Sequence, residues 1–119
     1  MLEKIVIANR GEIAVRIIRA CAEAGITSVA IYADPDRHAL HVKKADEAFS
    51  LGEDPLAGYL NVHRIVNLAA STGCDAIHPG YGFLSENPEL AAACARRGIV
   101  FIGPSAEVIQ RMGDKTEAR

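Results

Sequence analysis

Residues 4–14, KIVIANRGEIA, decide the fold. Residues 5–8 are a short β-branched run, which is typical of a buried strand. Residues 9–11 (NRG) end that run, and from residue 12 apolar side chains recur at helical spacing until Gly25, which ends the helix. A strand that leads at once into a helix indicates a β-α unit, from which parallel sheets are built.

The rest of the chain repeats this alternation. We predict further strands at residues 28–32, 48–51, 75–78 and 99–102, and helices at 38–44, 62–71, 88–97 and after Ser105. Such an order predicts an α/β fold: an open, mostly parallel sheet with helices on both faces. Ligands of such sheets bind beyond the carboxyl ends of the strands. The segments expected there are residues 9–11, 34–36, 78–87 and 103–104.

Composition excludes several classes of protein. The 119 residues carry a formal net charge of −2, so no nucleic-acid or membrane partner is predicted. No apolar run approaches the ~20 residues of a membrane-spanning helix. The three cysteines are widely spaced without a CxxC pair, which predicts buried free thiols rather than disulfides or a zinc site. That usage fits a cytoplasmic protein, or one of the mitochondrial matrix in a eukaryote.

The histidines and the first turn suggest no chemistry by themselves. His38, His41 and His63 match no metal-ligand spacing, and we expect them at the surface. The turn after residue 8 holds Gly11 but no G-x-G-x-x-G, which argues against a dinucleotide binder. The plainer interpretation is that Gly11 makes a tight turn and Asn9 satisfies backbone groups. No catalytic triad, phosphate-cradling loop or carboxylate dyad can be assigned.

Residues 78–87, HPGYGFLSEN, are the most informative loop. They follow a predicted strand, contain two glycines that allow close backbone approach, and precede a helix N-terminus that favours an anion. A binding site is one interpretation, and a rigid turn anchored by Phe83 and Leu84 is another. The polar side chains of the loop are His78, Tyr81, Ser85, Glu86 and Asn87.

One face of the first helix carries a charged stripe of Glu12, Arg16, Arg19 and Glu23, at i, i+4, i+7 and i+11. Two favourable i,i+4 ion pairs are possible along it. The stripe is either a solvated face or, because its − + + − order matches its own reverse, a contact in a two-fold dimer.

The C-terminal residues suggest a further domain. Asp114 and Glu117 have capping-box spacing, so a helix should begin at Lys115, yet the chain stops at Arg119. A single turn cannot stand alone. We therefore expect one domain at residues 1–112, and at 113–119 the start of a helix into a domain not included here. Lys115 opposes the helix dipole, so it is either an exposed lysine or a ligand of a phosphate.

Four motifs in order resemble the N-terminal domain of biotin carboxylases: KIVIANRGEIA (4–14), HPGYGFLSEN (78–87), FIGP (101–104) and MGDK (112–115). The resemblance covers essentially the whole chain, and HPGYGFLSEN is highly specific. It implies a Rossmann-like domain that precedes an ATP-grasp domain, in an enzyme that uses MgATP and bicarbonate to carboxylate biotin. Residues 36–46 and 54–61 resemble pyruvate carboxylases more than acetyl-CoA carboxylases.

The resemblance also implies roles for residues. Lys115 would contact the nucleotide, and the loop with His78, Tyr81, Gly82 and Glu86 would face the biotin and bicarbonate. The stripe with Arg16, Arg19 and Glu23 would lie near a homodimer contact. The partners of the full enzyme would be the biotin carboxyl carrier protein and a carboxyltransferase. The catalytic residues and metal ligands would lie outside the chain, so residues 1–119 alone should be inactive. A non-catalytic binding or dimerisation module is the alternative.

Overall fold

The computed structural model describes residues 2–54, 58, 61–80 and 87–103. Within them a five-stranded sheet has the order β3-β2-β1-β4-β5, and every pairing is parallel. The predicted fold class is confirmed. The strands are β1 (Lys4–Ile7), β2 (Thr27–Tyr32), β3 (Glu47–Ser50), β4 (Ala76–His78) and β5 (Val100–Phe101).

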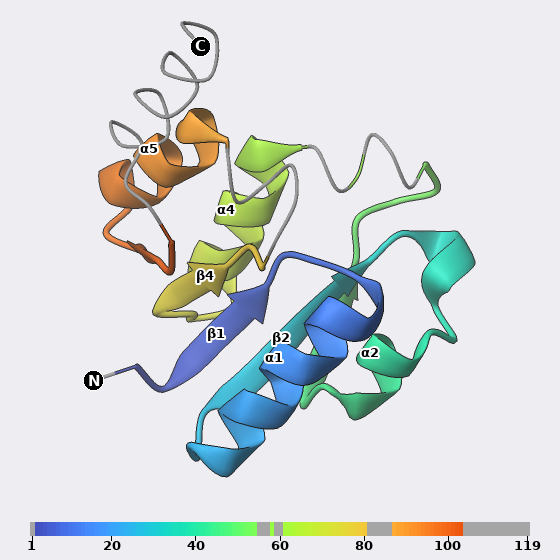
Figure 1. Ribbon diagram of the computed structural model, residues 1–119. Coiled ribbons are helices and arrows are strands. Elements are labelled where there is room, and N and C mark those ends of the chain that lie inside the picture. The colour runs from blue at the N-terminus through green and yellow to red at the C-terminus, as the bar shows by residue number, and fades with distance from the viewer. Residues whose placement is uncertain (1, 55–57, 59–60, 81–86, 104–119) are drawn as a thin grey trace, which may run out of the picture.

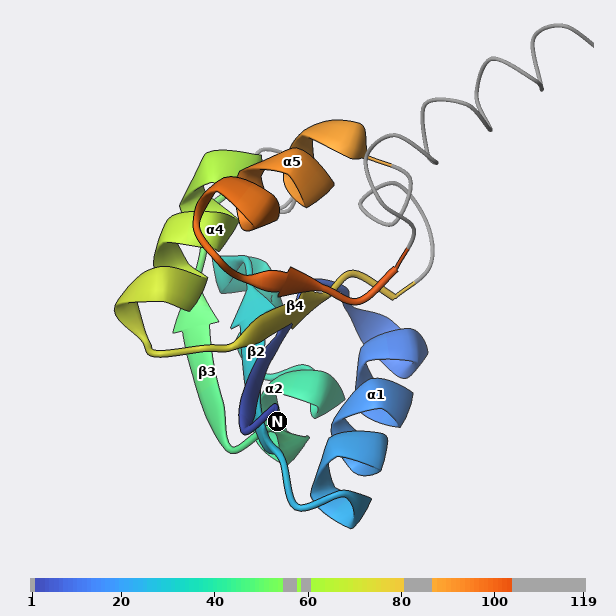
Figure 2. The same cartoon turned by 90° about the vertical axis from the view of Figure 1, so that its left-hand side faces the viewer.

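Helices cover both faces of the sheet (Figures 1 and 2). One face carries α1 (Gly11–Glu23) and α2 (Leu40–Lys44), and the other carries α4 (Val62–Ser71) and α5 (Pro88–Arg96). A short 3₁₀ helix, η1 (Asp34–Asp36), forms in one of the segments expected beyond the carboxyl ends of the strands. The two helical layers leave the carboxyl ends of the strands as the edge where a site can form.

The central strand β1 shows why its sequence is apolar throughout. Val6 and Ala8 join the core cluster under α4 and α5, and Ile5 and Ile7 join the cluster under α1. All four side chains are at most 3% exposed. A strand that is buried on both faces cannot alternate with polar residues, so it appears in the sequence as a continuous β-branched run.

Asparagine side chains cap the starts of α4 and α5. Asn61 Oδ1 accepts the backbone N–H of Arg64 at 3.1 Å, at the start of α4. Asn87 Oδ1 accepts the backbone N–H of Glu89 at 2.9 Å, and Pro88 occupies the first position of α5. β5 is shorter than the predicted 99–102. The helix expected after Ser105 and the tail at 113–119 lie outside the described residues.

His41 corrects one prediction. It is only 1% exposed, and its Nε2–H donates to the carbonyl oxygen of Ile31 in β2 at 3.1 Å. Among the described residues, its Nδ1 finds no hydrogen-bond partner. The prediction failed because α2 has five residues, too few for helical periodicity to distinguish an inward face from an outward one. His38 and His63 are exposed as predicted.

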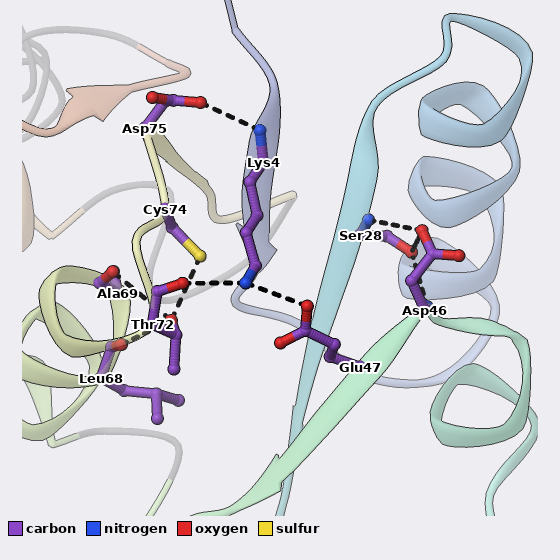
Figure 3. Close-up of polar contacts among 9 residues, drawn as sticks. All are labelled: Lys4, Ser28, Asp46, Glu47, Leu68, Ala69, Thr72, Cys74 and Asp75. Carbon is purple, nitrogen blue, oxygen red and sulfur yellow. Dashed lines mark hydrogen bonds and ion pairs between the residues drawn. The ribbon is translucent and has the colours of Figure 1, made fainter.

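Side chains connect the strands at the amino edge of the sheet (Figure 3). Lys4 Nζ lies 2.9 Å from Glu47 Oε2 on β3 and donates to the carbonyl oxygen of Thr72 at 2.8 Å. Asp75 Oδ2 accepts the backbone N–H groups of Glu3 and Lys4, at 2.8 and 3.0 Å. These bonds favour the carboxylate form and lower the pKa of Asp75. β1 is thereby joined at its amino end to β3 and to the segment that enters β4.

The cysteines are free and buried, as predicted. Cys21 is on α1 and faces the sheet, whereas Cys74 and Cys94 pack on the opposite face of the sheet. Burial raises the pKa of all three thiols, and that of Cys94 to about 11. They are therefore protonated at neutral pH and act as small apolar side chains.

Replacing Lys4 by Met should lower the free energy of unfolding by about 1–2 kcal/mol, because a partly buried ion pair and a hydrogen bond to a carbonyl are lost together. Arg16→Met is the matched control, since the Arg16–Glu12 pair is 74% and 78% exposed. It should cost less than about 0.5 kcal/mol. Urea denaturation of both variants measures the difference, and equal costs would contradict the role given to Lys4.

Candidate functional site

The carboxyl ends of β1 and β4 form the base of the predicted site. Ile7 pairs with His78 at the end of the two strands, and the backbone N–H of Ala8 donates to the carbonyl oxygen of His78 at 2.9 Å. This last rung brings Asn9 beside Pro79. Two predicted loops, residues 9–11 and the start of 78–87, therefore meet at one point of the sheet edge.

Asn9 bonds to backbone on both sides. Its Nδ2–H donates to the carbonyl oxygen of Pro79 at 2.8 Å, and its Oδ1 accepts the backbone N–H of Arg10, also at 2.8 Å. Gly11 has φ +68°, a left-handed conformation suited to glycine. The sequence interpretation of this turn is confirmed, and the structure adds the backbone that Asn9 reaches.

Gly80 lies directly against that turn. Its φ is +66°, and a Cβ built there would be 2.7 Å from Asn9 Nδ2 and 2.9 Å from Ile13 Cγ2 on α1. Both distances are shorter than those of real Cβ contacts, so any side chain at position 80 would require Asn9 and Ile13 to move. The sequence indicated that glycines in this loop permit close approach, but it could not indicate what approaches.

His78 is held in one tautomer. Its Nδ1 accepts the backbone N–H of Gly80 at 3.1 Å, so in the neutral ring the proton is on Nε2. Burial disfavours the charged ring and lowers the pKa of His78 below its ordinary value. At neutral pH the imidazole is uncharged and supports the Gly80 backbone.

Elsewhere along the carboxyl edge, charged side chains bond to other side chains of the same edge. Arg10 Nη2 lies 2.9 Å from Asp36 Oδ1, and Asp34 Oδ1 accepts the hydroxyl of Ser50 at 2.5 Å. In dinucleotide-binding folds the acidic group after the second strand holds a ribose. Here Asp34, which follows β2, is bonded to a neighbouring strand. Together with the single glycine of the first turn, this argues further against a dinucleotide site.

A mostly apolar groove of about 470 Å³ runs beside α1. Ile5, Ile13 and Ile17 contribute to its lining, with Arg16 and His78 as its polar members. Two sequence-predicted residues from different motifs thus border one groove. No sequence pattern indicated this groove, because it needs α1 to lie beside the strand end that carries His78.

The charged stripe of α1 is exposed in the free chain. Arg16, Arg19 and Glu23 all lie at the surface, and Arg16 Nη2 pairs with Glu12 Oε1 at 3.1 Å. Of the two predicted ion pairs, only this one forms within the described part of the chain. Exposure suits a solvated face and a dimer contact equally well.

Other predicted residues lie outside the described ranges: Tyr81, Gly82, Glu86 and Lys115. In the ranges that are described, no group of three or more His, Cys, Asp or Glu side chains could hold a metal ion. In those same ranges no helix has the length and apolar character needed to cross a bilayer.

Comparisons with known proteins agree on one group of relatives. Biotin carboxylase from Halalkalibacterium halodurans is 59% identical over 120 residues, which is 100% of this chain and 26% of that protein. The chain therefore spans about a quarter of that relative's length.

Solved structures give the same result. The biotin carboxylase subunit of a pyruvate carboxylase matches with a TM-score of 0.94 and 60% identity, over 99% of this chain and 26% of that one. The biotin carboxylase domain dimer of the Hydrogenobacter thermophilus 2-oxoglutarate carboxylase was solved with MgADP, ADP and bicarbonate. It matches with a TM-score of 0.90 and 56% identity, over 92% of this chain and 24% of that one.

The lowered pKa of His78 predicts a pH dependence of stability. The unfolded chain takes up a proton on His78 near pH 6.5, while the folded chain resists it. The contribution of the neutral ring is therefore full above pH 6.5 and is lost as pH falls toward the folded pKa. His78→Gln should flatten the melting temperature between pH 7 and 5, and exposed His38→Gln should not. An unchanged profile in His78→Gln would contradict this account.

Gly80→Ala should destabilise the chain more than Gly98→Ala. Both glycines have positive φ, which costs alanine about 1–2 kcal/mol. At Gly98 the new Cβ meets nothing within 4 Å, whereas at Gly80 it meets Asn9 and Ile13. The overlap should add about 1–3 kcal/mol in chemical denaturation. Similar losses in the two variants would show that Gly80 is not in close contact.

A family model matches this chain as well. The profile of the family described as "Biotin carboxylase, N-terminal domain" matches residues 1–109. That range includes every strand and helix described above. The parallel sheet, the loop base at His78 and the three motifs within residues 1–109 agree with it, and we conclude that this chain belongs to the biotin carboxylase N-terminal domain family.

Proposed function

We propose that this chain works as the N-terminal domain of a longer biotin carboxylase, which uses ATP and bicarbonate to carboxylate biotin on a carrier protein. The observation that carries the proposal is the 59% identity over the whole chain to a biotin carboxylase. The chain spans 26% of that relative, so the proposed activity needs residues that the relative has beyond the matched part. Such an enzyme is an ATP-dependent carbon-nitrogen ligase.

The loop at residues 78–87 is assigned to the biotin and bicarbonate side of the active site, with His78, Tyr81, Gly82 and Glu86 as its members. Its support within the described residues is the base: β4 ends at His78, and Gly80 is seated on Asn9 and Ile13. Lys115 is assigned to the nucleotide. The 2-oxoglutarate carboxylase domain solved with MgADP and bicarbonate is consistent with these ligands.

ATP, Mg²⁺ and biotin are the proposed cofactors. ATP would supply the phosphoryl group that activates bicarbonate for transfer to biotin. Among the described residues no cluster suits a divalent metal, and the carboxylates after β2 bond to Ser50 and Arg10. We therefore assign this domain a role in holding the biotin-side loop, and assign the magnesium ligands to the rest of the enzyme.

We assign the α1 surface to a homodimer contact. Arg16, Arg19 and Glu23 are exposed, and Arg16 also borders the apolar groove beside α1. A surface that combines an apolar groove with charges in self-complementary order suits an isologous interface. The further partners are the biotin carboxyl carrier protein and a carboxyltransferase. The reduced cysteines fit the cytoplasm, or the mitochondrial matrix in a eukaryote.

The proposal predicts a difference between the complete polypeptide and residues 1–119. The complete polypeptide should form ADP from ATP in a reaction that depends on bicarbonate and is stimulated by biotin. Residues 1–119 alone should fix no ¹⁴C-bicarbonate on biotin, because they lack the ATP-grasp residues. Carboxylation by residues 1–119 would contradict the division of labour. An inactive complete polypeptide would favour a non-catalytic binding or dimerisation module.

A further inference from the structure

We propose that Asn9 is a positioning residue for biotin carboxylation, because its side-chain amide fixes the backbone from which the biotin-side loop starts. The inference rests on the proposed function and adds to it a residue outside the loop itself. Asn9 lies at the end of β1, far in sequence from the loop, yet its Nδ2–H donates to the carbonyl oxygen of Pro79 at 2.8 Å.

The orientation of the Asn9 amide is determined at both ends. Its Oδ1 accepts the backbone N–H of Arg10, which leaves the NH₂ group facing Pro79. The reverse orientation would place two oxygens against each other and the NH₂ group against an N–H. Asn9 therefore presents a donor in a fixed direction, and the carbonyl of Pro79 is held in that direction.

Close packing of Gly80 against Asn9 and Ile13 adds to this hydrogen bond. A Cβ on Gly80 would lie 2.7 Å from Asn9 Nδ2, 3.3 Å from Asn9 Cβ and 2.9 Å from Ile13 Cγ2. The backbone of Gly80 thus rests on the Asn9 side chain and on α1. From the other side, the N–H of Gly80 donates to His78 Nδ1 at 3.1 Å. Contacts with Asn9, Ile13 and His78 together set the direction in which the chain leaves the sheet.

The loop is also fixed where it ends. Asn87 caps α5 through the backbone N–H groups of Glu89 and Leu90, at 2.9 and 3.4 Å. Leu90 is fully buried, so this end is anchored in the core. The start of the loop, at Pro79 and Gly80, therefore depends on Asn9 and Ile13, and its end depends on α5. Misplacement of reacting groups by about 1 Å can cost 10²-fold in rate.

Aspartate and alanine at position 9 remove the donor in different ways. An aspartate has the same shape but would set a carboxylate oxygen against the carbonyl oxygen of Pro79. An alanine removes the amide without adding charge. Because a new carboxylate near the bicarbonate side could repel the substrate, a positioning role requires both variants to be impaired.

The test uses the complete polypeptide that carries this sequence. Asn9→Asp and Asn9→Ala should each lower kcat/KM for biotin about 10- to 100-fold, while the apparent KM for ATP stays close to that of the unchanged enzyme. The matched control is Asn67→Asp on α4. This variant adds the same charge. Asn67 Oδ1 accepts a hydrogen bond from Arg97 at 2.6 Å, which an aspartate oxygen can also accept, so both constants should stay unchanged.

The outcomes separate the two proposals. If the unchanged enzyme does not carboxylate biotin, the proposed function fails, whatever Asn9 does. If it does, and both Asn9 variants keep their kcat/KM for biotin, the positioning role is overturned. Loss in Asn9→Asp alone would assign the effect to charge, and a rise in the apparent KM for ATP matching the loss for biotin would assign it to general destabilisation. Both results would overturn the role, and melting temperatures of the variants identify the second.

Discussion

Val6 of β1 pairs with Ile77 of β4, and the placement of the remaining elements follows from that contact between distant parts of the sequence. Closing so long a loop costs conformational entropy before any contact is gained. Burial on both faces of the sheet offsets this cost, because Val6 and Ile77 are fully buried. Side chains reinforce the same two strands at each end. Lys4 and Asp75 join them at the amino edge, and Asn9 joins β1 to the segment leaving β4 at the carboxyl edge.

Much of the architecture could be predicted because it is encoded locally. Asn61 and Asn87 each cap a helix through a hydrogen bond to a backbone N–H only two or three residues further along the chain. The order of the strands is not encoded locally, because nothing in residues 5–8 or 75–78 indicates that these two strands are neighbours. Without that adjacency, the contact between Asn9 and Pro79 could not be predicted. His41 was placed wrongly for a related reason, since its burial depends on β2 lying beneath a one-turn helix.

The same limit applies to the site. Spacing and loop composition singled out the α1 stripe and residues 78–87, motif resemblance implied their roles, and the glycines of the loop indicated close approach. What Gly80 approaches is a side chain from the turn after β1 and another from α1, and this became apparent only in three dimensions. The described residues at the carboxyl edge are mostly occupied with one another, as Arg10 with Asp36 and Asp34 with Ser50. Such a surface is suited to holding a loop in place more than to performing proton transfer.

The buried thiols can report on the opening of each helical layer of the domain. Cys21 reports on the sheet face beneath α1, whereas Cys74 and Cys94 report on the face beneath α4 and α5. With pKa values raised by burial, none is a nucleophile while its layer remains packed. A thiol reagent therefore labels only molecules in which a layer has opened, and the labelled position identifies the layer. The natural sequence thus permits the opening of the two helical layers to be timed separately, without an engineered probe.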